Sequence, residues 1–79
     1  MNKHILLVMK WLDNKDSVSQ EELEKSKNEA NIAPDGAAHD LAYDAVYTAC
    51  DGANAAYWVN KYFIETGEDK NEYLKELNK

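Results

Sequence analysis

The stretch AAHDLAYDAVYTACDGANAAYWVNKYFIET, residues 37–66, decides the fold class. Its apolar side chains recur every three or four residues, which is the period of an α-helix. Gly67 follows the stretch and is typical of a residue that ends a helix. Gly52 lies near the middle, where one glycine costs about 1 kcal/mol, a cost that well-packed flanks can offset. The pattern therefore predicts one long helix, kinked at most at Gly52, rather than two short helices.

Segments at both ends of the chain also have helical patterns. Residues 3–13 carry a broad apolar face with a helical period. A strand at residues 5–9 is the weaker alternative, because no partner strand is visible elsewhere in the sequence. A final short helix is expected over residues 69–77, with Asp69 as its N-cap and Glu72 three residues later.

A second helix begins near Ser19, where Ser19 and Glu22 form the pattern of a capping box. Ser17 with Gln20 is an alternative start. Pro34-Asp35-Gly36 marks the clearest break, and Asp35 can cap the long helix that follows. The sequence thus predicts an all-α fold, a small helical bundle or long helical hairpin of three to four helices, in one domain over residues 1–79.

The chain is acidic, and its charge is uneven. It has fifteen Asp and Glu against nine Lys and no Arg, for a net charge of −6. Ten of these acids and three lysines lie between Asp13 and Tyr57, a net charge of −7, so the remainder is close to neutral. Such a field repels phosphate, which disfavours direct binding to nucleic acid or anionic membranes, and it attracts a basic protein surface. Solubility alone is the simpler explanation of the acidity.

Cysteine content and the N-terminus indicate a cytoplasmic protein. Cys50 is the single cysteine and cannot form an internal disulfide, which fits a reducing compartment. The N-terminal apolar run covers only Ile5 to Met9 before Lys10 interrupts it. This run is too short to span a bilayer, and no small-residue cleavage site follows it.

The helical period sorts residues 37–66 onto two faces. One face is lined with small side chains, which would let the helix of residues 3–13 or a second copy approach closely. Its members, the candidate self-association residues, are Ala38, Ala42, Ala45, Ala49, Ala53 and Ala56, extended by Val59 and Phe63. The opposite face combines carboxylates and aromatic rings. Its members are Asp40, Asp44, Tyr47, Asp51, Trp58 and Tyr62, flanked by Tyr43 and Asn54.

The acidic-aromatic face has two interpretations. It is either a solvated helix face whose aromatic rings fold onto neighbouring helices, as Trp58 and Tyr62 could do with Trp11, or a binding surface. Carboxylates one helical turn apart lie about 6 Å apart, close to the spacing of phosphates on a DNA strand. Tyrosine and tryptophan are enriched at binding hot spots, and Tyr47 is the ring expected to face outward. The candidate partner-binding residues are Asp40, Tyr43, Asp44, Tyr47 and Asp51.

No catalytic or metal-binding motif stands out. His39, Asp40 and Asp44 have a spacing found in metal sites, but a zinc site needs three or four protein ligands. Cys50 lies among small apolar residues and is interpreted as a packing residue. Residues 18–32 faintly resemble the recognition segment of a helix-turn-helix protein, yet they hold four Glu against two Lys, which argues against DNA reading. We therefore expect no enzyme activity, cofactor or metal.

Two blocks of the chain resemble a known group of proteins. ILLVMKWLDNKDSVSQEEL, residues 5–23, and AAYWVNKYFIETGEDKNEYL, residues 55–74, are similar to end blocks of small, functionally uncharacterised accessory proteins of tailed bacteriophages. In that group the end blocks flank a middle rich in Ala, Asp and Tyr, a style that residues 37–56 share. The resemblance brings no catalytic motif and implies an accessory protein that acts inside the bacterial host cell.

Charge and resemblance together predict a non-enzymatic phage protein that binds a host or defence protein and inhibits it as a charge decoy. The expected partner is a bacterial host protein with a basic surface, with no direct contact to nucleic acid or membrane. The alternative is a self-associating structural or assembly protein that forms a homo-oligomer through the Ala-rich face.

Overall fold

The computed structural model describes residues 1–32 and 37–78, and these residues form helices and connections without any strand. The α-helices are α1 (Lys3–Asp13), α2 (Gln20–Ile32), α3 (Ala37–Cys50), α4 (Ala55–Thr66) and α5 (Lys70–Leu77), with a short 3-10 turn, η1 (Lys15–Ser17), after α1. The predicted all-α class is confirmed. Among the described residues, no helix combines the length and apolar character that crossing a membrane requires. The break predicted at residues 34–36, with Asp35 as a cap, lies outside the described residues.

The prediction of one long helix is wrong. α3 ends at Cys50 and α4 begins at Ala55, so the described residues contain five α-helices rather than three to four. Gly52 adopts a φ of 70°, in the left-handed region that favours glycine and ends helices. Asn54 then caps α4, because its side chain accepts a hydrogen bond from the Tyr57 N–H at 3.4 Å. A stop signal followed directly by a start signal outweighs the helical period of the flanks.

The other predicted helix ends are confirmed. The Glu22 N–H donates to Ser19 Oγ at 3.1 Å and the Ser19 N–H donates to Glu22 Oε1 at 3.3 Å, which is a capping box. Asp69 caps α5 by accepting from the Asn71 N–H at 2.9 Å. Gly67 ends α4 with a φ of 70°. Local side-chain chemistry therefore defines where these helices begin and end.

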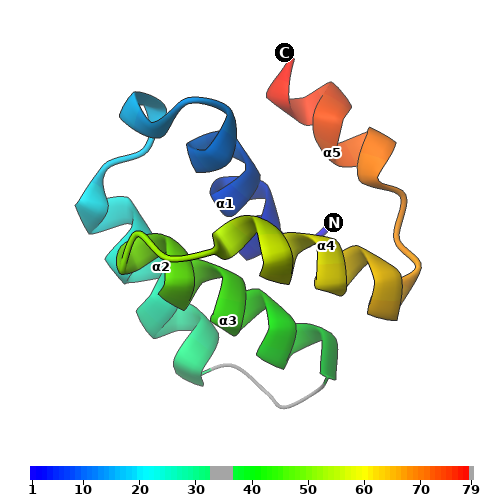
Figure 1. The fold of residues 1–79 in the computed structure, drawn as a ribbon, viewed down its shortest axis with the longest axis horizontal. Helices are drawn as coiled ribbons and strands as arrows, with labels where there is room; N and C mark the ends of the chain where they lie inside the picture. The colour runs from blue at the N-terminus through cyan, green and yellow to red at the C-terminus, as the bar shows by residue number, and fades with distance from the viewer. Residues whose placement is uncertain (33–36, 79) are drawn as a thin grey trace.

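The helices pack around α1 (Figure 1). α3 and α4 lie side by side as a hairpin, α2 packs on α3, and α1 contacts α2, α3, α4 and α5. The core is made mostly of small and medium side chains, and burying each Val or Ile in it contributes about 1.5–3 kcal/mol. Its buried members are Ile5, Val8, Met9, Val18, Leu23, Ala42, Ala45, Val46, Ala49, Ala55, Val59, Tyr62 and Tyr73.

Two buried tyrosines and one carboxylate attach α5 to the rest of the fold. Tyr62 and Tyr73 are each 1% exposed. The Tyr62 hydroxyl donates to Glu68 Oε2 at 2.5 Å, and the Tyr73 hydroxyl donates to Glu68 Oε1 at 2.6 Å. Tyr73 Oη also accepts a hydrogen bond from the Asn2 N–H at 2.6 Å. This phenol network joins the two ends of the chain and uses Tyr62, Glu68 and Tyr73 for structure rather than binding.

Candidate functional site

The acidic stripe, defined as Asp40, Tyr43, Asp44, Tyr47 and Asp51, lies along the outer side of α3. Asp40, Tyr47 and Asp51 are exposed, whereas Tyr43 and Asp44 are partly buried. The five residues fall within a sector of about 100° around the helix axis. The opposite side of α3 supplies buried residues to the core. The stripe therefore lies on the solvent side of α3, with its outermost carboxylates at either end.

Asp44 is partly desolvated and also repelled by Asp40. Burial and the neighbouring Asp40 together raise the pKa of Asp44 above its ordinary value of 3.8. Within residues 1–32 and 37–78, no hydrogen bond or ion pair engages the carboxylates of Asp40, Asp44 or Asp51. With no partner among the described residues, these carboxylates can be approached by a cation from outside the chain.

One aromatic ring of the stripe, Tyr47, contacts a lysine of the neighbouring helix α2. The Tyr43 and Tyr47 ring centroids lie 6.0 Å apart, and Lys27 Nζ of α2 lies 5.6 Å from the Tyr47 ring centroid. This lysine was missed from the sequence because it comes from another helix. Spacing within one helix gives no signal for such a contact. The stripe is therefore a feature of the α2–α3 pair.

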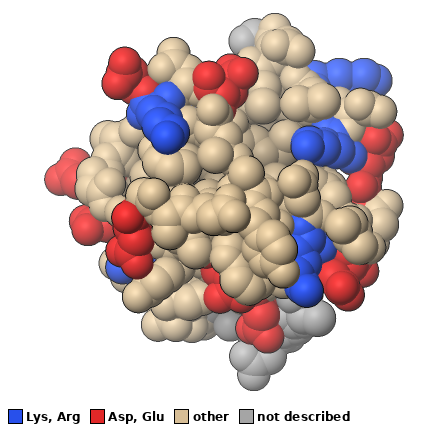
Figure 2. Space-filling view, in the orientation of Figure 1, with Lys and Arg blue, Asp and Glu red and all other residues tan. Residues whose placement is uncertain are grey.

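Aromatic residues 58 and 62 do not belong to the stripe, contrary to the helical-wheel prediction. Because the chain turns at Gly52, Trp58 and Tyr62 lie on α4, where Trp58 is partly buried and Tyr62 is buried. Tyr47 faces outward as expected with 46% exposure, although Tyr57 is slightly more exposed at 51%. Figure 2 shows the face on which α4 crosses α1, and its centre is largely free of charged side chains.

The Ala-rich face is also divided by the turn. Ala42, Ala45 and Ala49 are at most 2% exposed, because they pack inside the chain's own core. Ala53 and Ala56 are exposed, one in the turn and the other on α4. The side chain of Ala38 lies outside what the structure describes. The six alanines therefore do not form one surface, and the long-helix assumption that grouped them is corrected.

Cys50 ends α3 beside the stripe. Its thiol is partly buried, and burial raises its pKa above the ordinary value of 9.0, with Glu24 and Asp51 adding to the rise against Lys27. A thiol with a raised pKa stays protonated at neutral pH and is a poor nucleophile. The Cys50 carbonyl accepts a hydrogen bond from Gln20 Nε2 at 3.2 Å, which satisfies a group at the helix end. Cys50 therefore contributes to the contact between α2 and α3 through its backbone carbonyl.

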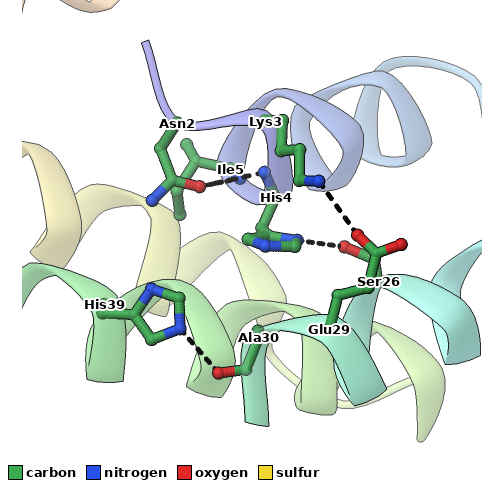
Figure 3. Close-up of polar contacts among 8 residues, drawn as sticks. All are labelled: Asn2, Lys3, His4, Ile5, Ser26, Glu29, Ala30 and His39. Atoms are coloured by element: carbon green, nitrogen blue, oxygen red, sulfur yellow. Dashed lines mark hydrogen bonds and ion pairs between the residues drawn. The ribbon is translucent and has the colours of Figure 1, made fainter. Parts of the chain in front are cut away.

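A second polar cluster was not predicted from the sequence (Figure 3). It joins α1, α2 and α3 through His4, Ser26 and His39, together with an ion pair between Lys3 Nζ and Glu29 Oε2 at 3.0 Å. His4 and Ser26 come from different helices, 22 positions apart in sequence, so no spacing signal links them. Among the described residues, no group of three or more His, Cys, Asp or Glu side chains could hold a metal ion.

Comparison with known proteins gives no match: neither the protein-family models, nor the curated proteins, nor the solved structures include one similar to this chain.

Proposed function

We propose that this protein is a non-enzymatic accessory protein of bacteriophage origin that binds a basic surface of a host or defence protein through the acidic stripe. The proposed partner is a protein of the bacterial cytoplasm, and the effect of binding is to cover the surface that the partner uses for its own anionic ligand. No direct contact with nucleic acid or membrane is proposed, because a net charge of −6 repels both phosphate and anionic lipid.

The observation that carries this proposal is the exposure of charged groups without an internal partner beside an exposed ring. Asp40 and Asp51 lie at either end of the stripe, and Tyr47 lies between them with 46% exposure. Opposite charges speed the encounter of two proteins, whereas a desolvated aromatic ring slows their dissociation. The stripe has both components on one side of α3.

The alternative, a homo-oligomer built through the Ala-rich face, has less support. Ala42, Ala45 and Ala49 already contact the chain's own core, so a second copy could reach them only if the helices moved apart. An oligomer through the acidic stripe would bring like charges together. Neither arrangement is favoured by the geometry of α3.

The test is capture of a partner from bacterial lysate by the tagged protein at low and at high salt. The stripe variant is Asp40→Lys with Asp44→Lys. Its control is Asp16→Lys with Glu65→Lys, which changes the net charge equally at exposed positions away from the stripe. We expect a stoichiometric partner that is lost at high salt and in the stripe variant but kept by the control.

Three outcomes contradict the proposal. A partner retained equally by both variants would mean that the stripe is not the interface. Self-association without any captured protein, unaffected by salt, would favour the structural alternative. A partner lost equally from both variants would show an effect of net charge alone, which also argues against the stripe.

A further inference from the structure

A buried histidine links α1 to α2. His4 of α1 is 6% exposed, and its Nδ1 lies 2.6 Å from the Oγ of Ser26, which is 7% exposed on α2. His39 of α3 reaches the same helix, because its Nε2–H donates to the Ala30 carbonyl at 2.6 Å. The two imidazole rings meet edge to face with centroids 6.1 Å apart (Figure 3). Two histidines from different helices thus hold successive turns of α2.

α2 buries few of its own side chains. Only Leu23, Ser26 and Ala30 are buried among its thirteen residues, and the rest of the helix is mostly charged or polar. One of these three positions is the partner of His4, and a second is the carbonyl partner of His39. Two of the three buried positions of α2 therefore contact imidazoles from other helices.

We propose that His4 and His39 form an acid-sensitive latch, in which protonation of His4 releases α2 from α1 and α3. The ring of His4 borders a hollow of about 260 Å³ between α1 and α2, which gives water and protons a path to it. The charged groups around that hollow are Lys3 on α1 and Glu22, Lys25 and Glu29 on α2, with His39 facing the ring from α3.

The charge, rather than the hydrogen bond, makes the protonated state unfavourable. A serine hydroxyl can donate to a neutral imidazole nitrogen or accept from a protonated one, so the contact with Ser26 could survive protonation. An imidazolium that is 6% exposed, however, loses most of its hydration. Burial and the nearby Lys3 lower the pKa of His4, Glu29 opposes them, and His39 adds a smaller lowering. Hydration of the charged ring through the hollow would separate α1 from α2.

The lowered pKa of His4 determines how the stability of the α1–α2 contact changes with pH. The ordinary pKa of histidine is 6.5, and the pKa of His4 in the folded state lies below it. At any pH between these two pKa values, the unfolded or opened state therefore binds more protons than the folded state. The hold on α2 therefore weakens as the pH falls below about 6.5, and this contribution becomes constant once the folded His4 is also protonated. Lys3 lowers the pKa of the Glu29 carboxyl from 4.5, so this carboxyl is protonated only at a pH below the range in which His4 titrates.

The experiment compares backbone hydrogen exchange at about pH 7.5 and about pH 5.5, after correction for intrinsic rates, while NMR follows the titration of His4. The expected result is a selective loss of protection in α2 at the lower pH, relative to α1 and α4. His4→Asn offers an oxygen close to the position of Nδ1 without a titratable ring, and should remove the pH dependence. His39→Gln can still donate to the Ala30 carbonyl and leaves His4 free to titrate.

For each unit by which folding lowers the pKa of His4, the equilibrium constant for opening of α2 should change by up to about tenfold. The change should occur over the pH range between the ordinary and the folded pKa of His4. The proposal is overturned if protection falls equally in all helices, if His4→Asn keeps the wild-type pH dependence, or if His4 titrates at or above its ordinary value. The last measurement uses the wild-type chain, so it decides the matter even if His4→Asn does not fold.

Discussion

Removal of the Glu68 side chain should destabilise this protein more than any other single change at its surface. Glu68 accepts hydrogen bonds from the hydroxyls of Tyr62 and Tyr73, and both rings are buried. A hydrogen bond to a charged group contributes about 1.5–3 kcal/mol, and an unsatisfied buried donor costs a similar amount. In Glu68→Ala both phenols lose their acceptor at once. Because Glu68 itself is exposed and water can replace part of its role, we expect a loss of about 2–4 kcal/mol rather than the full sum.

The assay is urea denaturation followed by far-UV circular dichroism. Glu65→Ala is the matched control, because it removes a carboxylate that is exposed near the end of α4, and a change within about 0.5 kcal/mol is expected there. A loss of 2–4 kcal/mol is a large part of the roughly 5 kcal/mol available to a small domain. If Glu68→Ala and Glu65→Ala unfold at the same urea concentration, the phenol network does not stabilise the fold.

The same network makes a prediction about pH. Burial alone would raise the pKa of Glu68, but the hydrogen bonds from Tyr62 and Tyr73 outweigh it and lower the pKa from 4.5. A carboxyl with a lowered pKa stabilises the fold above its unfolded value and loses that contribution as the pH falls through its folded value. The difference between wild type and Glu68→Ala should therefore shrink below about pH 4. A difference that stays constant would contradict the hydrogen-bond account.

Three further changes test other parts of the structure. Gly52→Ala should lower the free energy of unfolding, measured by urea denaturation, by about 1–2 kcal/mol, because φ is 70° at this residue. No atom lies within 4 Å of an added Cβ, so backbone strain is the whole effect. A loss under about 0.5 kcal/mol would contradict the turn. Ala49→Glu should abolish the helical circular dichroism signal, because it places a charge at a position that is 2% exposed; a folded variant would argue against burial of this face. Asp44→Asn should stabilise by a few tenths of a kcal/mol near neutral pH, because it removes a partly desolvated charge and its repulsion from Asp40. This gain should disappear as acid protonates the wild-type carboxyl, whose pKa is raised, and a loss of stability at neutral pH would refute it.

The predictable part of this fold is the part encoded by neighbours in sequence. The bounds of α1, the capping box at Ser19, the Gly67 stop and the Asp69 cap depend on a few consecutive residues, and the structure has each of them as predicted. The turn at residues 51–54 was also encoded locally. Asp-Gly followed by Asn is a stop followed by a cap, and the regular period of the flanking apolar residues outweighed this signal in the prediction.

The unpredictable part depends on contacts between helices. Angular position around α3 could be calculated from the sequence, so the four stripe residues within α3 share one side of that helix, and Asp51 follows in the turn. The lysine from α2 that lies over Tyr47, and the serine that meets His4, could not be derived from spacing, since each joins segments about 20 residues apart. One error, continuing the helix through Gly52, was enough to assign Trp58 and Tyr62 to the wrong surface.

The size of the stripe limits how it can bind a partner. A stable interface covers about 800 Å² on each protein, which is about a sixth of the 4970 Å² of accessible surface here. Asp40 and Asp51 are about 16 Å apart along the helix axis, so a strip one helix wide supplies only part of that area. The proposed interface must therefore extend onto a neighbouring helix, and α2, with Lys27 against Tyr47, is the one that adjoins the stripe.

An interface across both helices would couple binding to the proposed latch. A partner that contacts α2 and α3 together binds the closed arrangement in preference to the released one, and so adds its binding free energy to the hold on α2. By reciprocity, protonation of His4 would weaken the partner's affinity by the same factor by which the partner opposes protonation. The bound protein should then release α2 only at a lower pH than the free protein. A partner confined to α3 would leave the release of α2 unchanged, so the pH shift measures how far the interface extends.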